Sequence, residues 1–202
     1  MTMLADDFFR LAHDDVTGRL RLSHRTISVG LAAALLGELL ALRRIQIVAS
    51  GDVRIIDRTP PEDAVAHMVL ERLVLEPRSR SLLVWVDRVA QSAYVDVAGR
   101  LMRAGQLRVQ VSRRLIGRVV TLFLPTDMNQ AARPMALLST QLRWRDPLNQ
   151  HDSHLAGLVL TTGLDRYVLD GAPAVARGYL RFVVEHLPPP MPQLLHAARV
   201  HL

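Results

Sequence analysis

Four basic residues stand directly before the most apolar stretch of the chain, and together they predict an anion-binding site. They are Arg19, Arg21, His24 and Arg25. The stretch that follows, residues 27–42, is apolar on every side of a helical wheel except at Ser28 and Glu38, which predicts a helix buried all round. The first turn of a helix offers free backbone N–H groups and the positive end of the helix dipole, and both favour anions. A phosphate group is therefore the expected ligand at this helix start.

Glu38 is the one candidate for a buried acid, because it lies inside this apolar stretch. A buried carboxylate has a raised pKa unless it is paired, and acids of this kind are enriched at functional sites. Buried charges are, however, normally paired with an opposite charge. We therefore expect Glu38 to be a structural partner of a core arginine, with Arg43, Arg44 and Arg72 as the candidates.

The common signatures of catalysis and cofactor binding are absent from the sequence. It contains no GxSxG, no P-loop, no GxGxxG after a strand and no HExxH, and the absence of cysteine excludes thiolate catalysis and cysteine-based zinc sites. His151 and His154 stand three apart around Asp152, but no third ligand is indicated, and a polar helix start is the simpler interpretation. We expect no enzyme activity, no cofactor and no metal.

The composition favours a folded chain with an anionic partner. The 202 residues suit one well-buried domain, and 25 basic against 19 acidic residues give a net charge of +6. All 25 of these basic residues are arginine, which binds phosphate in a forked geometry.

Residues 27–42 are too few to cross a bilayer, which requires about twenty apolar residues. The first residues do not resemble a signal peptide, so a cytoplasmic location is expected, with the inner face of the membrane as the site of action.

The hydrophobic periodicity predicts a mainly α fold, a single globular domain of helices around the central buried helix, with two β-hairpins. The hairpins are expected at residues 44–57 and 106–124, and residues 126–134 as a loop. Helices are expected at 4–13, 27–42, from Thr59 to 75, from 81, at 95–104, 134–144, 155–168 and 172–185. We assign residues 1–187 to the domain and 188–202 to a Pro-rich break and a short C-terminal tail, either mobile or packed on the domain.

The tip of the second hairpin combines basic and apolar residues, and apolar residues are unusual in a turn. The residues are Arg113, Arg114, Leu115, Ile116 and Arg118. They suit either insertion into a membrane interface or self-association. The helix before this hairpin also allows a winged-helix arrangement, but it offers only Arg100 and Arg103 and no side chains suited to base edges. Nucleic acid is therefore the less favoured partner.

Five stretches, in their order along the chain, resemble the Golgi phosphoprotein 3 family. They are residues 4–9 with 14–20, residues 30–43, residues 77–79 with Trp85, residues 105–107 before the basic hairpin, and residues 154–160. The resemblance runs from about Leu4 to His186. It implies a mostly helical domain around a central hydrophobic helix, which binds phosphatidylinositol 4-phosphate at a membrane and uses a hairpin for insertion or self-association.

The resemblance also implies where the headgroup would bind, although the family's own residues are replaced. The family's tryptophan corresponds to Ser23, its arginine within the central helix to Ala32, and its two later arginines to Gln91 and Tyr94. We expect the basic residues before the central helix, joined by Arg88 and Tyr94, to rebuild a less specific anionic site. The sequence thus favours a peripheral membrane protein that binds anionic phospholipid or phosphoinositide headgroups, with a homo-oligomer left open. The alternative is a cytosolic interaction or regulatory module, with nucleic-acid binding through its basic hairpin left open.

Overall fold

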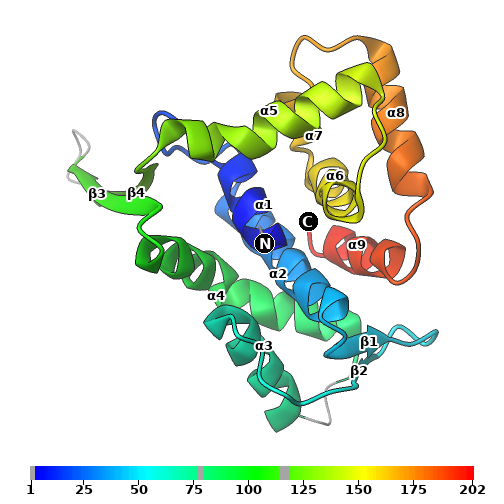
Figure 1. The fold of residues 1–202 in the computed structure, drawn as a ribbon. Helices are drawn as coiled ribbons and strands as arrows, with labels where there is room; N and C mark the ends of the chain where they lie inside the picture. Colours follow the sequence, from blue (N-terminus) through cyan, green and yellow to red (C-terminus); the bar gives the residue numbers. More distant parts are fainter. Residues whose placement is uncertain (1–2, 77–79, 114–118) are drawn as a thin grey trace.

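One long apolar helix, α2, runs through the middle of the protein, and the other helices surround it (Figure 1). The computed structural model describes residues 3–76, 80–113 and 119–202. Its helices are α1 (Leu4–Ala12), α2 (His24–Ala41), α3 (Ala64–Leu75), α4 (Leu82–Arg103), α5 (Met128–Trp144), α6 (Gln150–Thr162), α7 (Asp165–Val168), α8 (Ala174–Glu185) and α9 (Met191–Val200). Its strands are β1 (Ile45–Ile47), β2 (Val53–Ile55), β3 (Leu107–Arg113) and β4 (Val119–Pro125). The predicted mainly α fold with two hairpins is confirmed.

Helix α2 is buried because nearly every residue of it is apolar or small. Every residue from Ile27 to Leu39 is buried, and helices α1, α4 and α9 pack around it. Gly30 permits the closest of these contacts, since a Cβ atom there would lie 2.2 Å from Cζ of Phe8 on α1. The helix begins at Ser23, whose hydroxyl accepts a hydrogen bond from the backbone N–H of Thr26 at 3.1 Å. The predicted burial is confirmed for Ile27 to Leu39, whereas Ala41 and Leu42 at the end of the predicted stretch are exposed, and the helix begins earlier than predicted, at His24.

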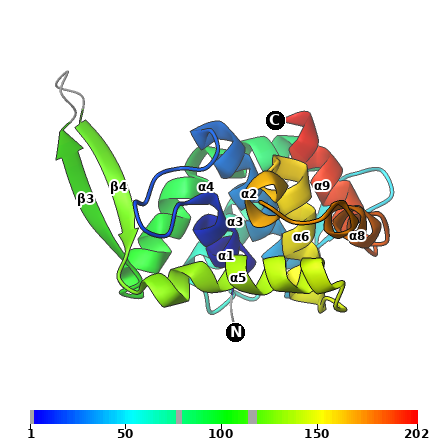
Figure 2. The same ribbon diagram turned by 90° about the horizontal axis from the view of Figure 1, so that it is seen from above.

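Both predicted hairpins are present as separate antiparallel pairs. Strand β1 pairs with β2 in the register Ile45↔Ile55, and strand β3 pairs with β4 so that Val109 faces Phe123. The second hairpin stands at one side of the helical body (Figure 2). Phe123 anchors its base, because the Phe123 ring lies 6.2 Å from Phe9 on α1.

Helix α3 begins later than the sequence analysis predicted. The prediction placed its start at Thr59, but Thr59 donates from both its backbone N–H and its hydroxyl to Asp57 and so closes a turn. Asp63 is the capping residue instead, and its carboxylate accepts from the N–H of Ala66 at 2.8 Å. The two prolines at 60 and 61 therefore precede the helix instead of opening it.

Helix α4 corrects a second prediction, because residues 82–103 form one helix and not two. No glycine or proline falls between residues 82 and 98, so nothing in the sequence marks a break. The structure also weakens the winged-helix interpretation, because one of its two expected DNA contacts is not available. Arg100 is one of only two arginines that it offered for DNA, and the side chain of Arg100 is buried inside the protein.

Helices α5 and α6 also differ from the predicted bounds. Helix α5 includes part of the expected loop, since it starts at Met128 under the Asp127 cap and continues through Pro134. The expected helix at 155–168 is divided, because Gly163 adopts a positive φ of 77° and ends α6 before the short α7. Residues 191–200 form helix α9, whose Leu194 and Leu195 are buried against the core. The C-terminal segment is therefore packed on the domain.

Candidate anion-binding site at the start of helix α2

The start of helix α2 is exposed and carries positive charge without a compensating acid. Its first turn contains no acidic residue, and His24 and Arg25, its first two residues, are exposed. The hydroxyl of Ser23 bonds to the backbone N–H and to the hydroxyl of Thr26, so the cap does not use the backbone N–H groups of residues 24 and 25, which belong to the open first turn. The segment before α2 passes strand β4, where Gly18 packs closely on the backbone of Phe123, and the beginning of α2 lies at the upper side of the molecule in Figure 2, the same side as the C-terminal end. The positive end of the helix dipole is thus open to an anion.

Arg25 at this end, and Arg19 in the segment that leads to it, carry side-chain charge that no acid compensates in the described ranges. Arg19 is exposed and, within the described ranges of the chain, its guanidinium forms no ion pair. Arg25 donates from Nε to the backbone carbonyl of His201 at 3.1 Å, which holds the side chain without neutralising it. Both guanidinium groups therefore keep a full charge for a ligand.

Arg21, in contrast, is directed into the protein. Its Nε donates to the carbonyl of His13 at 2.9 Å, and its Nη2 lies 3.4 Å from Asp15 and 3.8 Å from Asp14. The guanidinium also lies 5.5 Å from the centre of the Tyr167 ring. Arg21 therefore holds the 14–20 segment in place, and its charge is already compensated.

Tyr94 lies beside His24 and is one of the predicted site residues that the structure brings to the helix start. The two rings are 4.5 Å apart, and the Tyr94 hydroxyl lies 3.0 Å from Nε2 of His13. Nδ1 of His13 lies 2.7 Å from the carbonyl of Phe9, which can only accept, so Nδ1 carries the proton and Nε2 accepts from Tyr94. Burial lowers the pKa of His13 to about 4 and raises the pKa of Tyr94 to about 12. Both groups are therefore neutral at physiological pH and shape the site without adding charge.

Arg88 lies elsewhere. Its guanidinium pairs with Glu76 at the end of α3 and lies 5.5 Å from the ring centre of Trp85. It is therefore directed towards α3 and not towards His24.

The predicted hairpin residues Arg114, Leu115, Ile116 and Arg118 lie outside the described residues, and Arg113 is the last residue of strand β3.

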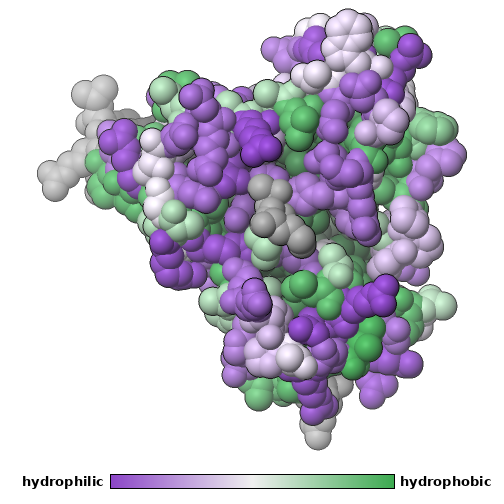
Figure 3. Space-filling view, viewed as in Figure 1, coloured by the Kyte–Doolittle hydropathy of each residue, from purple (hydrophilic) through white to green (hydrophobic). Residues whose placement is uncertain are grey.

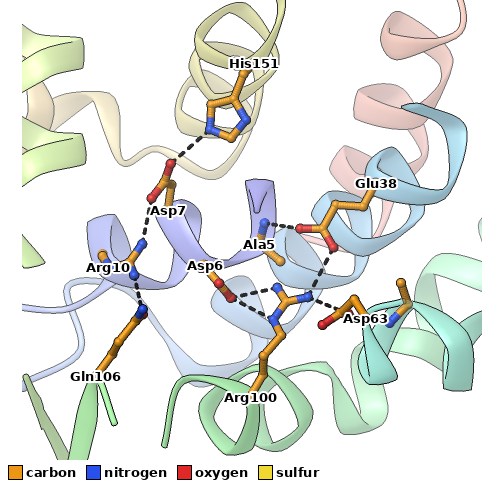
Figure 4. A network of polar contacts seen from close by, with 10 residues as sticks. Ala5, Asp6, Asp7, Arg10, Glu38, Asp63, Arg100, Gln106 and His151 are labelled. Atoms are coloured by element: carbon orange, nitrogen blue, oxygen red, sulfur yellow. Dashed lines mark hydrogen bonds and ion pairs between the residues drawn. The ribbon is translucent and has the colours of Figure 1, made fainter. Parts of the chain in front are cut away.

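The buried acid Glu38 pairs with Arg100, which was not among the partners predicted for it. Arg100 lies 3.3 Å from Glu38, 2.9 Å from Asp63 and 2.7 Å from Asp6, and Glu38 also accepts from the N–H of Ala5 at 2.8 Å (Figure 4). This network joins α1, α2, α4 and the cap of α3. Burial raises the pKa of Glu38 and of Asp6, and the charge of Arg100 opposes that rise.

The partners proposed for Glu38 are therefore wrong, and the structure gives each of them another position. Arg44 pairs with Asp57, and Arg72 donates to the hydroxyl of Ser92 at 2.7 Å. Arg43 is exposed at the end of α2 with a positive φ of 54°. Sixty-two residues separate Glu38 from Arg100, so no local pattern could have connected them.

His151 belongs to a second polar network, on the side of α1 that faces α6. Its Nε2 lies 2.9 Å from Asp7, and the other oxygen of Asp7 accepts from Arg10 at 2.7 Å. The bond to Asp7 raises the pKa of His151. These side chains border a cavity of about 360 Å³ between α1, α5 and α6. Among the described residues, no group of three possible ligands could hold a metal ion.

This geometry defines a class of protein: a helical domain whose central buried helix presents its basic N-terminal end at the surface. A comparison with known families matches residues 4–182 to the family described as Golgi phosphoprotein 3 (GPP34). The chain therefore belongs to the Golgi phosphoprotein 3 family. No curated protein matches it significantly. In the part of the chain that the structure describes, no helix has both the length and the apolar character needed to cross a membrane.

Proposed function

We propose that this protein is a peripheral membrane protein that binds anionic lipid headgroups, such as that of phosphatidylinositol 4-phosphate, at the start of helix α2. The observation that carries the proposal is the exposed positive helix end with Arg25 in its first turn; neither Arg25 nor Arg19, in the preceding segment, makes an ion pair in the described ranges. A phosphate there would accept bonds from backbone N–H groups and from guanidinium groups together. Membership of the Golgi phosphoprotein 3 family supports a lipid ligand.

The positions at which family members bind the headgroup also support this location. Ser23 caps α2, and Tyr94 packs against His24, so two of the four corresponding positions border the helix start. Ala32 is completely buried two turns further along α2. An arginine is absent at all four positions. We therefore propose a site at the family's location that recognises phosphate charge with less selectivity among headgroups.

The second membrane contact in the proposal is the tip of the β3–β4 hairpin. It rests on the sequence, which places Leu115 and Ile116 among arginines. Apolar side chains with basic neighbours suit the boundary between headgroups and acyl chains. Self-association through the same tip is the other outcome. Replacing Leu115 and Ile116 by serine separates the two, because loss of vesicle binding supports insertion and a fall in sedimentation mass supports association.

The test of the headgroup site is a matched pair of double variants. Arg19→Gln with Arg25→Gln removes the two arginines of the proposed site that form no ion pair in the described ranges. Arg133→Gln with Arg145→Gln removes two exposed arginines, one within α5 and one directly after it, and α5 lies on the opposite side of the molecule in Figure 2. Each basic residue near an anionic surface contributes about 1 kcal/mol, so the first variant should bind anionic vesicles about 30-fold more weakly. Its salt dependence should also be flatter.

The control variant should bind as the wild type does. Equal losses in the two variants would show that only net charge matters, and unchanged binding in the first would remove the site from the start of α2. We propose that the protein acts at the cytoplasmic face of the membrane, where anionic lipids concentrate.

A further inference from the structure

We propose that four exposed aliphatic side chains beside the start of α2 form an apolar rim that enters the headgroup region of an anionic membrane. They are Leu83 and Val84 at the beginning of α4, and Val200 and Leu202 at the end of α9. The inference rests on the proposed function, since it adds an apolar contact beside the proposed headgroup site. It concerns residues that lie about 60 and about 175 positions along the chain from that site.

A single residue, His201, connects the two helices of this rim, α4 and α9, to the start of α2. Its Nε2 donates to the carbonyl of Leu83 at 2.9 Å, and its own carbonyl accepts from Nε of Arg25 at 3.1 Å. Leu194 and Leu195 anchor α9 in the core one to two turns earlier. The apolar side chains on both sides of His201 are therefore held in place next to a headgroup-binding arginine.

The exposure of these side chains is the reason to expect an apolar environment for them. Val200 is 57% exposed and Leu202 is 45% exposed, and Leu83 and Val84 are each 39% exposed. Exposed apolar side chains that gather in one place mark interaction surfaces. The beginning of α2 and the C-terminal end lie on the same side of the molecule in Figure 2. The rim and the proposed headgroup site could therefore contact one membrane surface together.

The charges around the rim favour an anionic membrane over a second copy of the chain. Arg25 and Arg199 are exposed on either side of His201, and neither forms an ion pair in the described part of the chain. Asp87, one turn beyond Leu83, is the exposed acid nearest in sequence on α4. Two copies joined through the rim would bring like charges together, which disfavours association. A layer of lipid phosphates would instead compensate both arginines while the aliphatic side chains pass between headgroups.

The face of the molecule opposite the rim has a different distribution of apolar side chains. In Figure 3, which is viewed as Figure 1 is, apolar side chains form separate patches among hydrophilic ones. The rim differs because its aliphatic side chains adjoin a positive helix end and two exposed arginines that form no ion pair among the described residues.

The test compares two double variants of equal exposure. Val200→Ser with Leu202→Ser changes the rim, and Val175→Ser with Leu137→Ser changes side chains that are 58% and 45% exposed on α8 and α5. Binding is measured by flotation with vesicles of phosphatidylcholine and phosphatidylserine. The rim variant should bind about tenfold more weakly, because the side chains at positions 200 and 202 can then no longer bury aliphatic surface in the headgroup region. Its salt dependence should stay as in the wild type, and the control should bind normally.

A site-specific probe gives the second measurement. Because the chain contains no cysteine, Leu202→Cys and Leu137→Cys each provide one thiol for an environment-sensitive fluorophore. The probe at position 202 should shift to shorter wavelength when vesicles are added, and the probe at position 137 should not.

Three results would overturn the inference. Wild-type protein that fails to bind the vesicles would refute both the proposed function and the rim. Wild-type protein that binds, together with a rim variant that binds equally well, would refute the rim alone. A blue shift at position 202 without lipid, accompanied by a doubled sedimentation mass that the rim variant abolishes, would show that the rim is a contact between copies.

Discussion

Replacing Arg100 by glutamine should destabilise the protein strongly and in a pH-dependent way. Arg100 is the only basic residue that contacts Asp6, Glu38 and Asp63 in the described network, and both Arg100 and Glu38 are buried. Removing one partner of a buried ion pair leaves an uncompensated charge and costs about 3–5 kcal/mol. Because folded domains are stable by only ~5–15 kcal/mol, this is a large share of the total.

The pH dependence follows from the acids that remain. Burial already raises the pKa of Glu38 and of Asp6, and Arg100 opposes this rise. Without Arg100 both pKa values should rise further. An acid whose pKa is higher in the folded state binds its proton more readily when folded, so stability increases as pH falls through that pKa. The loss of stability should therefore be large at pH 7.5, on the order of 3–5 kcal/mol, and clearly smaller at about pH 5.

Urea unfolding at the two pH values measures this effect. Glu38→Gln combined with Arg100→Gln should recover part of the loss at pH 7.5, because one uncompensated charge is then absent. Arg72→Gln is the control, since Arg72 is partly exposed and bonds to Ser92, and it should cost less than about 1 kcal/mol. An equal loss at both pH values, without recovery in the double variant, would refute the assignment of the network as a buried, charge-compensated core.

Two further predictions concern the packing around α1. His151 should titrate with a pKa above its ordinary value of about 6.5, because its bond to Asp7 stabilises the protonated ring, and Asp7→Asn should lower that pKa in an NMR titration. The stability supplied by this pair should be fully present below the unfolded pKa and should be lost as pH rises through the folded pKa, so pH-independent unfolding would contradict it. Gly30→Ala should cost about 1–3 kcal/mol, since its Cβ would overlap the Phe8 ring, whereas Gly178→Ala, in open space on α8, should stabilise by about 0.5–1 kcal/mol. Thermal unfolding distinguishes these two, and equal shifts in melting temperature would refute the close contact.

The sequence predicts those parts of the fold that depend on local patterns. The all-round apolar character of 27–42 predicted the buried helix α2, and the alternation at 44–57 and 106–124 predicted both hairpins. Helix boundaries were less accurate: the prediction started α3 at Thr59, but Thr59 closes a turn on Asp57 and Asp63 caps the helix. A proline also does not always mark a helix start, because Pro134 lies inside α5.

The candidate site was predicted only in part, because long-range contacts decide which arginines are free. Arg21 and Arg25 look equivalent in the sequence, yet Arg21 pairs with Asp14 and Asp15 while Arg25 forms no ion pair with any residue that the structure describes. Arg88, which was predicted to join the site, instead forms an ion pair with Glu76 at the end of α3. The contact of Arg25 with His201, which brings the end of the chain to the site, spans 176 residues and leaves no trace in local periodicity.

The most direct test of the proposed headgroup site is an NMR titration of the protein with a water-soluble, short-chain phosphatidylinositol 4-phosphate. The largest shift changes should occur at the backbone N–H groups of His24 and Arg25, with a smaller change at the Tyr94 ring, and the Arg19→Gln, Arg25→Gln variant should lose them. Changes centred instead on the cavity between α1, α5 and α6, or no change at all, would contradict anion binding at the start of helix α2.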